Sequence, residues 1–320
     1  MSLCPASKEA GPGRANAPSR EVLLALDARP SGRADVSRLP VVDHDAGSVT
    51  TRCEKLSSPI KPVAPWIGGK RNLAKEIIRR VGLVPHDLYA EPFVGMGGIF
   101  LRRPSRARVE VINDWSRDVA TFFRVLQRHY VAFLEMMRFQ LTTRSEFERL
   151  SLTDPDTLTD LERAARFLYL QRVAYGGKVA GQNFGVSATT PARFDITKLA
   201  PMLEDLHTRL AGVVIERLGY AEFILRYDRK EALFYLDPPY YGSEGDYGAD
   251  LFSRSDFGAI EGVLRHLKGR FILSLNDHPE VRRIFAAYRM EAVTTTYTIG
   301  SSNDRGNAGE VIISNIGGCW

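Results

Sequence analysis

The sequence DPPY at positions 237–240 places an acid, two prolines and an aromatic ring directly after the apolar run ALFYL. Proline fixes φ and has no N–H to donate, so this segment ends a strand rather than extending it. The Asp237 carboxylate and the Pro238 carbonyl can accept both hydrogens of an exocyclic amine, and Tyr240 can stack on a planar base at about 1–3 kcal/mol. These residues predict a site that holds an amino-substituted ring and directs its lone pair toward an electrophile. The alternative is a proline-stiffened turn with a capping aspartate.

A second candidate site follows the segment DLYAEPF, where the chain continues as a glycine-rich turn. Its glycines, Gly95, Gly97 and Gly98, would let the backbone approach a ligand closely beyond the end of a strand. Asp114 ends the next predicted strand about 20 residues later, where an acid commonly accepts hydrogen bonds from ribose hydroxyls. The glycine spacing is not G-x-G-x-x-G, and a Walker lysine is missing. We therefore predict a nucleoside-like ligand, with an ordinary structural turn as the alternative.

The elements that must position these residues alternate between strands and helices. Such alternation predicts an α/β fold with a parallel or mostly parallel sheet. The last two strands are joined by a polar loop and are expected to form an antiparallel hairpin at the sheet edge. The predicted strands are 87–93, 108–114, 231–237, 269–277, 290–299 and 309–315, and the helices between them are 72–81, 116–137, 253–267 and 278–288.

A mainly helical block interrupts this alternation at residues 140–212. We therefore predict a catalytic α/β domain formed by 59–139 and 213–320, with 140–212 as an insertion. A block in this position commonly carries substrate specificity, and the alternative is a helical layer that only covers the core. Residues 1–58 are rich in Ala, Gly, Pro, Ser and Arg, so we expect a disordered N-terminal extension.

Charge and cysteine content narrow the class of protein. The 43 Lys and Arg exceed the 38 Asp and Glu, and the stretch 61–108 alone holds ten basic residues against three acids. That distribution is compatible with contacts to a nucleic-acid backbone. The three cysteines lie far apart and lack metal-ligand spacing, so we expect neither a metal site nor a disulfide framework. The sequence shows no apolar run of about 20 residues and no signal peptide, and we expect a cytoplasmic protein.

Four motifs in order, PWIGGK, EPFVGMGG, IND and DPPY, resemble those of the Dam-type (alpha-class) DNA adenine-N6 methyltransferases over about residues 62–315. The resemblance implies a Rossmann-like sheet that binds S-adenosyl-L-methionine (SAM), with a helical target-recognition insertion. It also implies methyl transfer to the 6-amino group of an adenine flipped out of duplex DNA. We expect a bacterial or phage-encoded monomer, either solitary or paired with a separate restriction endonuclease.

The resemblance also implies roles for individual residues. The catalytic residues are Asp237, Pro238 and Tyr240. The donor-binding residues are Trp66, Lys70, Glu91, Phe93, Gly95, Asp114 and Asp237. In the insertion, Arg172 and Tyr175 match a run that contacts DNA in the family, and Lys178 is the nearest basic residue downstream. Gly176 stands where the family commonly has asparagine, so the recognised DNA sequence does not follow from the resemblance.

Two alternative functions remain open from the sequence. One is methylation of another planar amine, either cytosine N4 or a side-chain amide, although a serine or asparagine in place of Asp237 would have favoured those substrates. The other is a DNA-binding protein that keeps a degenerate SAM pocket. Intact motifs argue against the second alternative, and stoichiometric SAM binding without turnover would support it.

Overall fold

The computed structural model describes residues 55–179, 181–185, 189, 191–247, 252–296 and 307–317. Residues 1–54, which make up nearly all of the predicted disordered extension, lie outside the described residues. The end of the predicted strand 290–299 and the loop after it also lie outside them.

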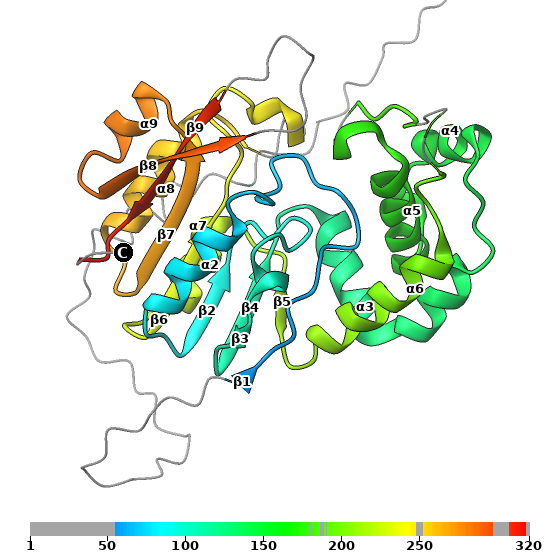
Figure 1. Cartoon of the computed structure of the whole chain (residues 1–320), viewed down its shortest axis with the longest axis horizontal. Helices are drawn as coiled ribbons and strands as arrows, with labels where there is room; N and C mark the ends of the chain where they lie inside the picture. The colour runs from blue at the N-terminus through cyan, green and yellow to red at the C-terminus, as the bar shows by residue number, and fades with distance from the viewer. Residues whose placement is uncertain are drawn as a thin grey trace, which may run out of the picture.

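A seven-stranded sheet in the order β5-β4-β2-β6-β7-β9-β8 forms the centre of the protein (Figure 1). The five strands from β5 to β7 are parallel, and β9 runs antiparallel to both β7 and β8. The predicted α/β fold with a mostly parallel sheet is therefore confirmed. The strands are β2 (Leu88–Glu91), β4 (Val109–Asn113), β5 (Val214–Glu216), β6 (Ala232–Leu236), β7 (Arg270–Asn276), β8 (Arg289–Thr296) and β9 (Asn307–Ser314).

The central strands are largely buried because helices cover both faces of the sheet. All five residues of β6 are buried, and alternate residues enter two different hydrophobic clusters. One face packs against α2 (Ala74–Leu83), and the other packs against α7 (Tyr220–Tyr227), α8 (Ser255–Arg265) and α9 (Pro279–Ile284). A separate two-stranded sheet pairs β1 (Lys55–Leu56) with β3 (Ser105–Arg106).

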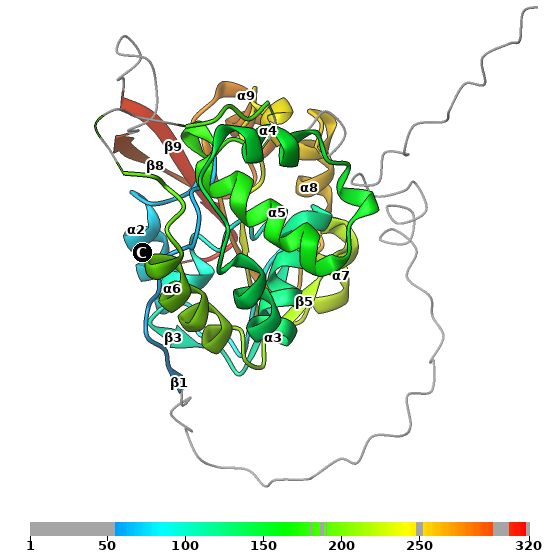
Figure 2. The same cartoon turned by 90° about the vertical axis from the view of Figure 1, so that its right-hand side faces the viewer.

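Four helices lie to one side of the sheet in Figure 1, and Figure 2 views them from that side. Ser116, Thr143 and Thr159 are the N-caps of the first three of these helices in chain order. Each side chain accepts a hydrogen bond from a backbone N–H of the first helical turn. Apolar residues of the four helices join the same hydrophobic cluster as α2 and one face of the sheet. The helices are α3 (Arg117–Met137), α4 (Arg144–Leu152), α5 (Asp160–Val173) and α6 (Ile196–Arg209). The division into domains stays a prediction.

A buried ion triad ties α6 to the sheet. Glu110 on β4 lies 2.8 Å from the Arg103 guanidinium and 2.6 Å from that of Arg209, the last residue of α6. All three side chains are nearly inaccessible to solvent. The two arginines share one carboxylate, so each relies on Glu110 for compensation of its buried charge.

Candidate active site

The DPPY segment begins directly beyond the carboxyl end of β6, as the sequence predicts. The Lys70 ammonium lies 2.7 Å from Oδ1 of Asp237, and the Ser274 hydroxyl on β7 donates to the same oxygen at 3.2 Å. Both donors contact Oδ1 rather than Oδ2 of Asp237. The carboxylate is thus held through Oδ1.

The remainder of the loop is also held from neighbouring elements. Tyr240 donates its hydroxyl hydrogen to Oε1 of Glu310 at 2.5 Å and accepts from the Lys70 ammonium at 2.8 Å. Asn276, the last residue of β7, accepts from the backbone N–H of Tyr241 at 2.9 Å and donates to its carbonyl at 3.0 Å. The loop therefore has a defined geometry before any base binds.

Burial raises the pKa of Asp237 above its ordinary value, and the adjacent Lys70 ammonium opposes that rise. Lys70 is itself buried, and it is the residue that brings the PWIGGK motif to the DPPY loop. The structure pairs Lys70 with the predicted catalytic acid, and its contact with the methyl donor stays a prediction. A buried cation at this distance keeps the carboxylate charged at lower pH than burial alone would allow.

A second set of predicted residues meets at the carboxyl ends of β2 and β4. Asp114 accepts hydrogen bonds from the backbone N–H groups of Gly95 and Ser116, both at 2.9 Å. Gly95 has a φ of 49°, and a Cβ atom there would lie 2.5 Å from Nε1 of Trp66. Only glycine fits this position, because a side chain would collide with the indole. Trp66, Gly95 and Asp114 are thus brought together as the sequence predicts.

Aromatic rings form one wall next to this turn. The Phe93 ring lies 5.6 Å from the ring of Tyr220 and 6.1 Å from that of Phe252, between centroids. Phe93 is partly accessible, whereas Tyr220 and Phe252 are buried. The chemistry available here is an apolar aromatic surface beside a carboxylate, which suits a nucleoside-like ligand.

A family model of D12 class N6 adenine-specific DNA methyltransferases matches residues 66–299. That span contains the PWIGGK segment from Trp66 onward, the glycine turn, Asp114 and the DPPY loop, which the fold brings to one edge of the sheet. The chain belongs to this family.

Relatives of this methyltransferase come from bacteria and viruses. It is 25% identical to the type II methyltransferase M1.LlaDCHI of Lactococcus lactis subsp. cremoris, over 81% of this chain and 96% of the relative. It is 20% identical to the type II methyltransferase M.CviBI of Paramecium bursaria Chlorella virus NC1A, over 72% and 88% of the two chains. The DNA N-6-adenine-methyltransferase of Escherichia phage P1 is 26% identical over 79% of this chain, which spans only 35% of that protein.

Glu91, the last residue of β2, is buried inside this methyltransferase. It is 2% exposed, and the Tyr89 hydroxyl donates to its carboxyl at 2.6 Å. Burial raises the pKa of Glu91 from the ordinary 4.5 to about 8. The side chain is therefore mostly protonated at neutral pH, and contact of Glu91 with the methyl donor stays a prediction.

Replacing this acid should make the methyltransferase less sensitive to high pH. Between about pH 4.5 and 8 the folded protein holds a proton at Glu91 that the unfolded chain has released, so stability falls as pH rises through this window. Glu91→Gln should raise the free energy of unfolding at pH 8 by on the order of 1–3 kcal/mol. Denaturant unfolding at pH 5 and pH 8 measures the effect. An equal pH dependence in parent and variant would contradict this account.

The end of α5 contacts the PWIGGK segment. Gln171 donates to the Pro65 carbonyl at 2.8 Å, and the Ile67 N–H donates to the Gly177 carbonyl at 3.0 Å. Arg172 donates to the carbonyls of Val63 and Arg193 at 2.9 and 2.8 Å. Arg172, which the sequence assigned to DNA, thus has its guanidinium occupied by backbone groups of the protein.

The other two predicted DNA contacts are on the surface. Tyr175 is 61% exposed, and Lys178 is exposed three residues later. Gly176 between them has a φ of 71°, in the left-handed region that glycine and asparagine both adopt. The glycine found in place of the family's asparagine therefore keeps a backbone conformation that both residues tolerate.

Part of the basic stretch 61–108 is occupied inside the protein. Lys70, Arg80 and Arg103 are buried in ion pairs, and Arg106 donates to carbonyls at and just after the C-terminal end of α6. The exposed members of the stretch remain accessible for the predicted phosphate contacts. These are Lys61, Arg71, Lys75, Arg79 and Arg108.

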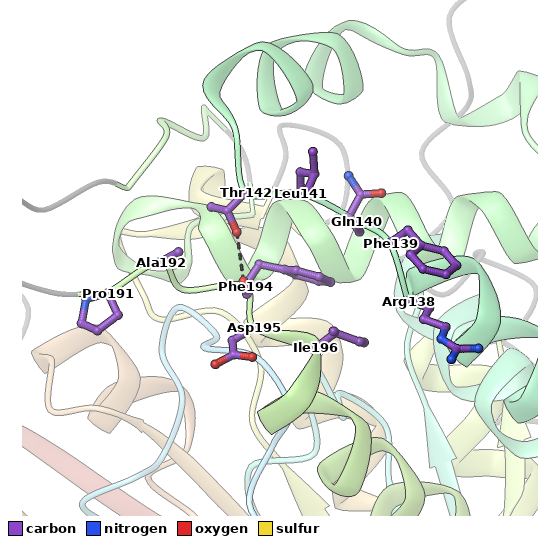
Figure 3. A pocket seen from close by; sticks show the side chains of 10 residues that line it. All are labelled: Arg138, Phe139, Gln140, Leu141, Thr142, Pro191, Ala192, Phe194, Asp195 and Ile196. Carbon is purple, nitrogen blue, oxygen red and sulfur yellow. Dashed lines mark hydrogen bonds between the residues drawn. The ribbon is translucent and has the colours of Figure 1, made fainter.

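A pocket of about 750 Å³ lies between the end of α3 and the start of α6 (Figure 3). Its lining includes Phe139, Leu141 and Phe194, and the Thr142 hydroxyl donates to the Phe194 carbonyl at 2.9 Å beside it. None of the predicted catalytic, donor-binding or DNA-binding residues lines this pocket. The described part of the chain also contains no group of His, Cys, Asp and Glu that could hold a metal, and no helix there is long and apolar enough to cross a membrane.

Proposed function

We propose that the protein transfers a methyl group from SAM to the 6-amino group of an adenine flipped out of duplex DNA. The observation that carries this proposal is the Asp237 carboxylate at the end of β6, held through Oδ1 by Lys70 and Ser274. The base must leave the stack first, because its amine is otherwise paired and inaccessible to a protein side chain.

The amine is gripped by two acceptors in this proposal. Oδ2 of Asp237 and the Pro238 carbonyl accept its two hydrogens, which concentrates the nitrogen lone pair on the side where the new bond forms. Positive charge then develops on the nitrogen next to a fixed carboxylate. Because burial raises its pKa, Asp237 is also a better acceptor for the proton that the amine loses. Tyr240 supports the ring of the base.

The residues at the ends of β2 and β4 fit SAM. When bound, SAM supplies an electrophilic methyl group. The Asp114 carboxylate is fixed by two backbone N–H groups and remains partly accessible, as an acceptor for ribose hydroxyls requires. Phe93 offers an apolar surface, and the glycine turn admits a ligand close to the backbone.

Asp114→Ala should weaken SAM binding by about 10-fold or more, because a hydrogen bond to a charged group is lost. Burial raises the pKa of Asp114 to about 6, so SAM affinity of the parent should fall as pH is lowered through this value, and the alanine variant should lack that dependence. Calorimetric titration with SAM between pH 5 and 8 tests both points. Unchanged affinity in the variant would remove Asp114 from the site.

The insertion 140–212 is proposed to recognise the target sequence, with Tyr175 and Lys178 on its DNA-facing surface. Tyr175→Ala should lower kcat/KM on the preferred site by roughly 10-fold, the effect of one base-edge or stacking contact. Its melting temperature should stay unchanged, because the side chain is exposed. Phe139→Ala is a matched control, since Phe139 is an exposed aromatic residue in the same helical region. Equal site preference in Tyr175→Ala and the parent would contradict this role.

The proposed reaction is tested by incubating duplex DNA that lacks methylated bases with the protein and SAM. The product is digested to nucleosides and separated by mass. N6-methyladenine should form with the parent and should be almost absent with an Asp237→Ala variant. Formation of N4-methylcytosine, or stoichiometric SAM binding without a methylated product, would contradict the proposal.

A further inference from the structure

We propose that Glu310 is a positioning residue of the methyl-transfer site and acts through the hydroxyl of Tyr240. The inference rests on the proposed function, in which Tyr240 supports the flipped base. Glu310 is on β9, in register with Asn276 of β7 and Val293 of β8, and it is 1% exposed. It thus reaches the DPPY loop from a strand far along the chain.

The contacts of the Tyr240 hydroxyl carry the inference. This hydroxyl donates to Oε1 of Glu310 at 2.5 Å and accepts from the Lys70 ammonium at 2.8 Å. A hydroxyl engaged both as donor and as acceptor fixes the tilt and rotation of its ring. Lys70 also lies 3.9 Å from Oε2 of Glu310, so the ammonium is shared between Glu310 and Asp237.

A carboxylate inside a sheet is costly unless it is paired. An apolar residue would fill the same position of β9 at lower cost, as Val311, Ile312 and Ile313 do directly after it. The acid is therefore not needed for packing. It contacts Tyr240 and, at longer range, Lys70, which are both residues of the candidate site. Buried polar groups that orient a site in this way stabilise a geometry rather than the fold.

The consequence for the reaction is a ring that is oriented before the base arrives. Tyr240 would present its stacking face at a fixed angle to Oδ2 of Asp237. Binding of the base would then not have to restrict the motion of the ring. Without Glu310 the hydroxyl loses the acceptor on β9 to which it donates, and the ring gains freedom. Misplacement of the base relative to the acceptors lowers the rate even when SAM is saturating.

A double-mutant cycle tests this role, with single-turnover methylation measured at saturating SAM on a site that the parent methylates. Glu310→Met, which removes the acceptor at similar length, and Tyr240→Phe, which keeps the ring, should each slow the reaction on the order of 10-fold. The double variant should be no slower than either single variant. Glu310→Gln, which keeps an accepting oxygen, should recover most of the parent rate.

A second readout separates positioning from folding. A duplex with 2-aminopurine at the target adenine reports extrusion of the base by an increase in fluorescence. Glu310→Met and Tyr240→Phe should both reduce that increase, whereas Glu291→Met, at an acid on neighbouring β8 that pairs with Arg80 and Arg289, should not. Losses that multiply in the double variant would overturn the inference. So would a Tyr240→Phe variant with the parent's rate and fluorescence, whether or not Glu310→Met folds. Absence of methylation by the parent would instead refute the proposed function.

Discussion

An Asp237→Ala variant should methylate DNA at least about 100-fold more slowly than the parent, a cost of about 3 kcal/mol in the activation barrier. The carboxylate acts where charge develops on the amine, so its loss affects the transition state most. Affinity for duplex DNA should change little, because it comes mainly from phosphate contacts elsewhere. Single-turnover methylation beside a gel-shift titration measures the two effects separately.

Lys70 loses its closest carboxylate partner in the Asp237→Ala variant. Asp237→Asn is the matched control, because it keeps the size of the side chain and one accepting oxygen while removing the charge. Both variants should be assayed at saturating SAM, with melting temperatures to show that they fold. A folded Asp237→Ala variant that methylates at near the parent rate would remove Asp237 from the chemistry.

Glu110→Gln should have the largest effect on stability, lowering the free energy of unfolding by on the order of 3–5 kcal/mol. The substitution leaves Arg103 and Arg209 buried side by side without a compensating charge. Urea denaturation followed by circular dichroism measures the loss. Glu76→Gln is the control, because Glu76 pairs with Arg79 and Arg80 in a much more accessible position and should cost about 1 kcal/mol or less. Equal stability of Glu110→Gln and the parent would contradict this account.

The backbone limits of proline and glycine made the ends of two strands predictable from the sequence, and with them the fold and the position of Asp237. Prolines cannot continue a strand, so Asp237 had to stand at its end, and the glycine turn had to follow β2. Parallel strands then bring their carboxyl ends to one edge, which unites Gly95 with Asp114. The elements that the sequence did not reveal were short: β5 has three residues, none of them buried, and α7 has eight.

The remaining site residues depend on contacts between distant parts of the chain. Ser274 and Glu310 are polar residues within apolar strands, which was the available signal, but only the strand order shows that they face the DPPY loop. Arg172 matched a family position for DNA contact, yet its guanidinium meets carbonyls at Val63 and Arg193. Side-chain direction at the end of α5 cannot be derived from spacing alone.

The order of the last strands has a consequence for how the protein is made. β8 precedes β9 in the chain, but it reaches the sheet through β9, which lies between it and β7. As the chain leaves the ribosome, β8 must therefore wait for a later segment before it can join the sheet. Glu310 is on β9. In a growing chain, Lys70 and Asp237 are therefore synthesised well before the carboxylate that accepts from the Tyr240 hydroxyl.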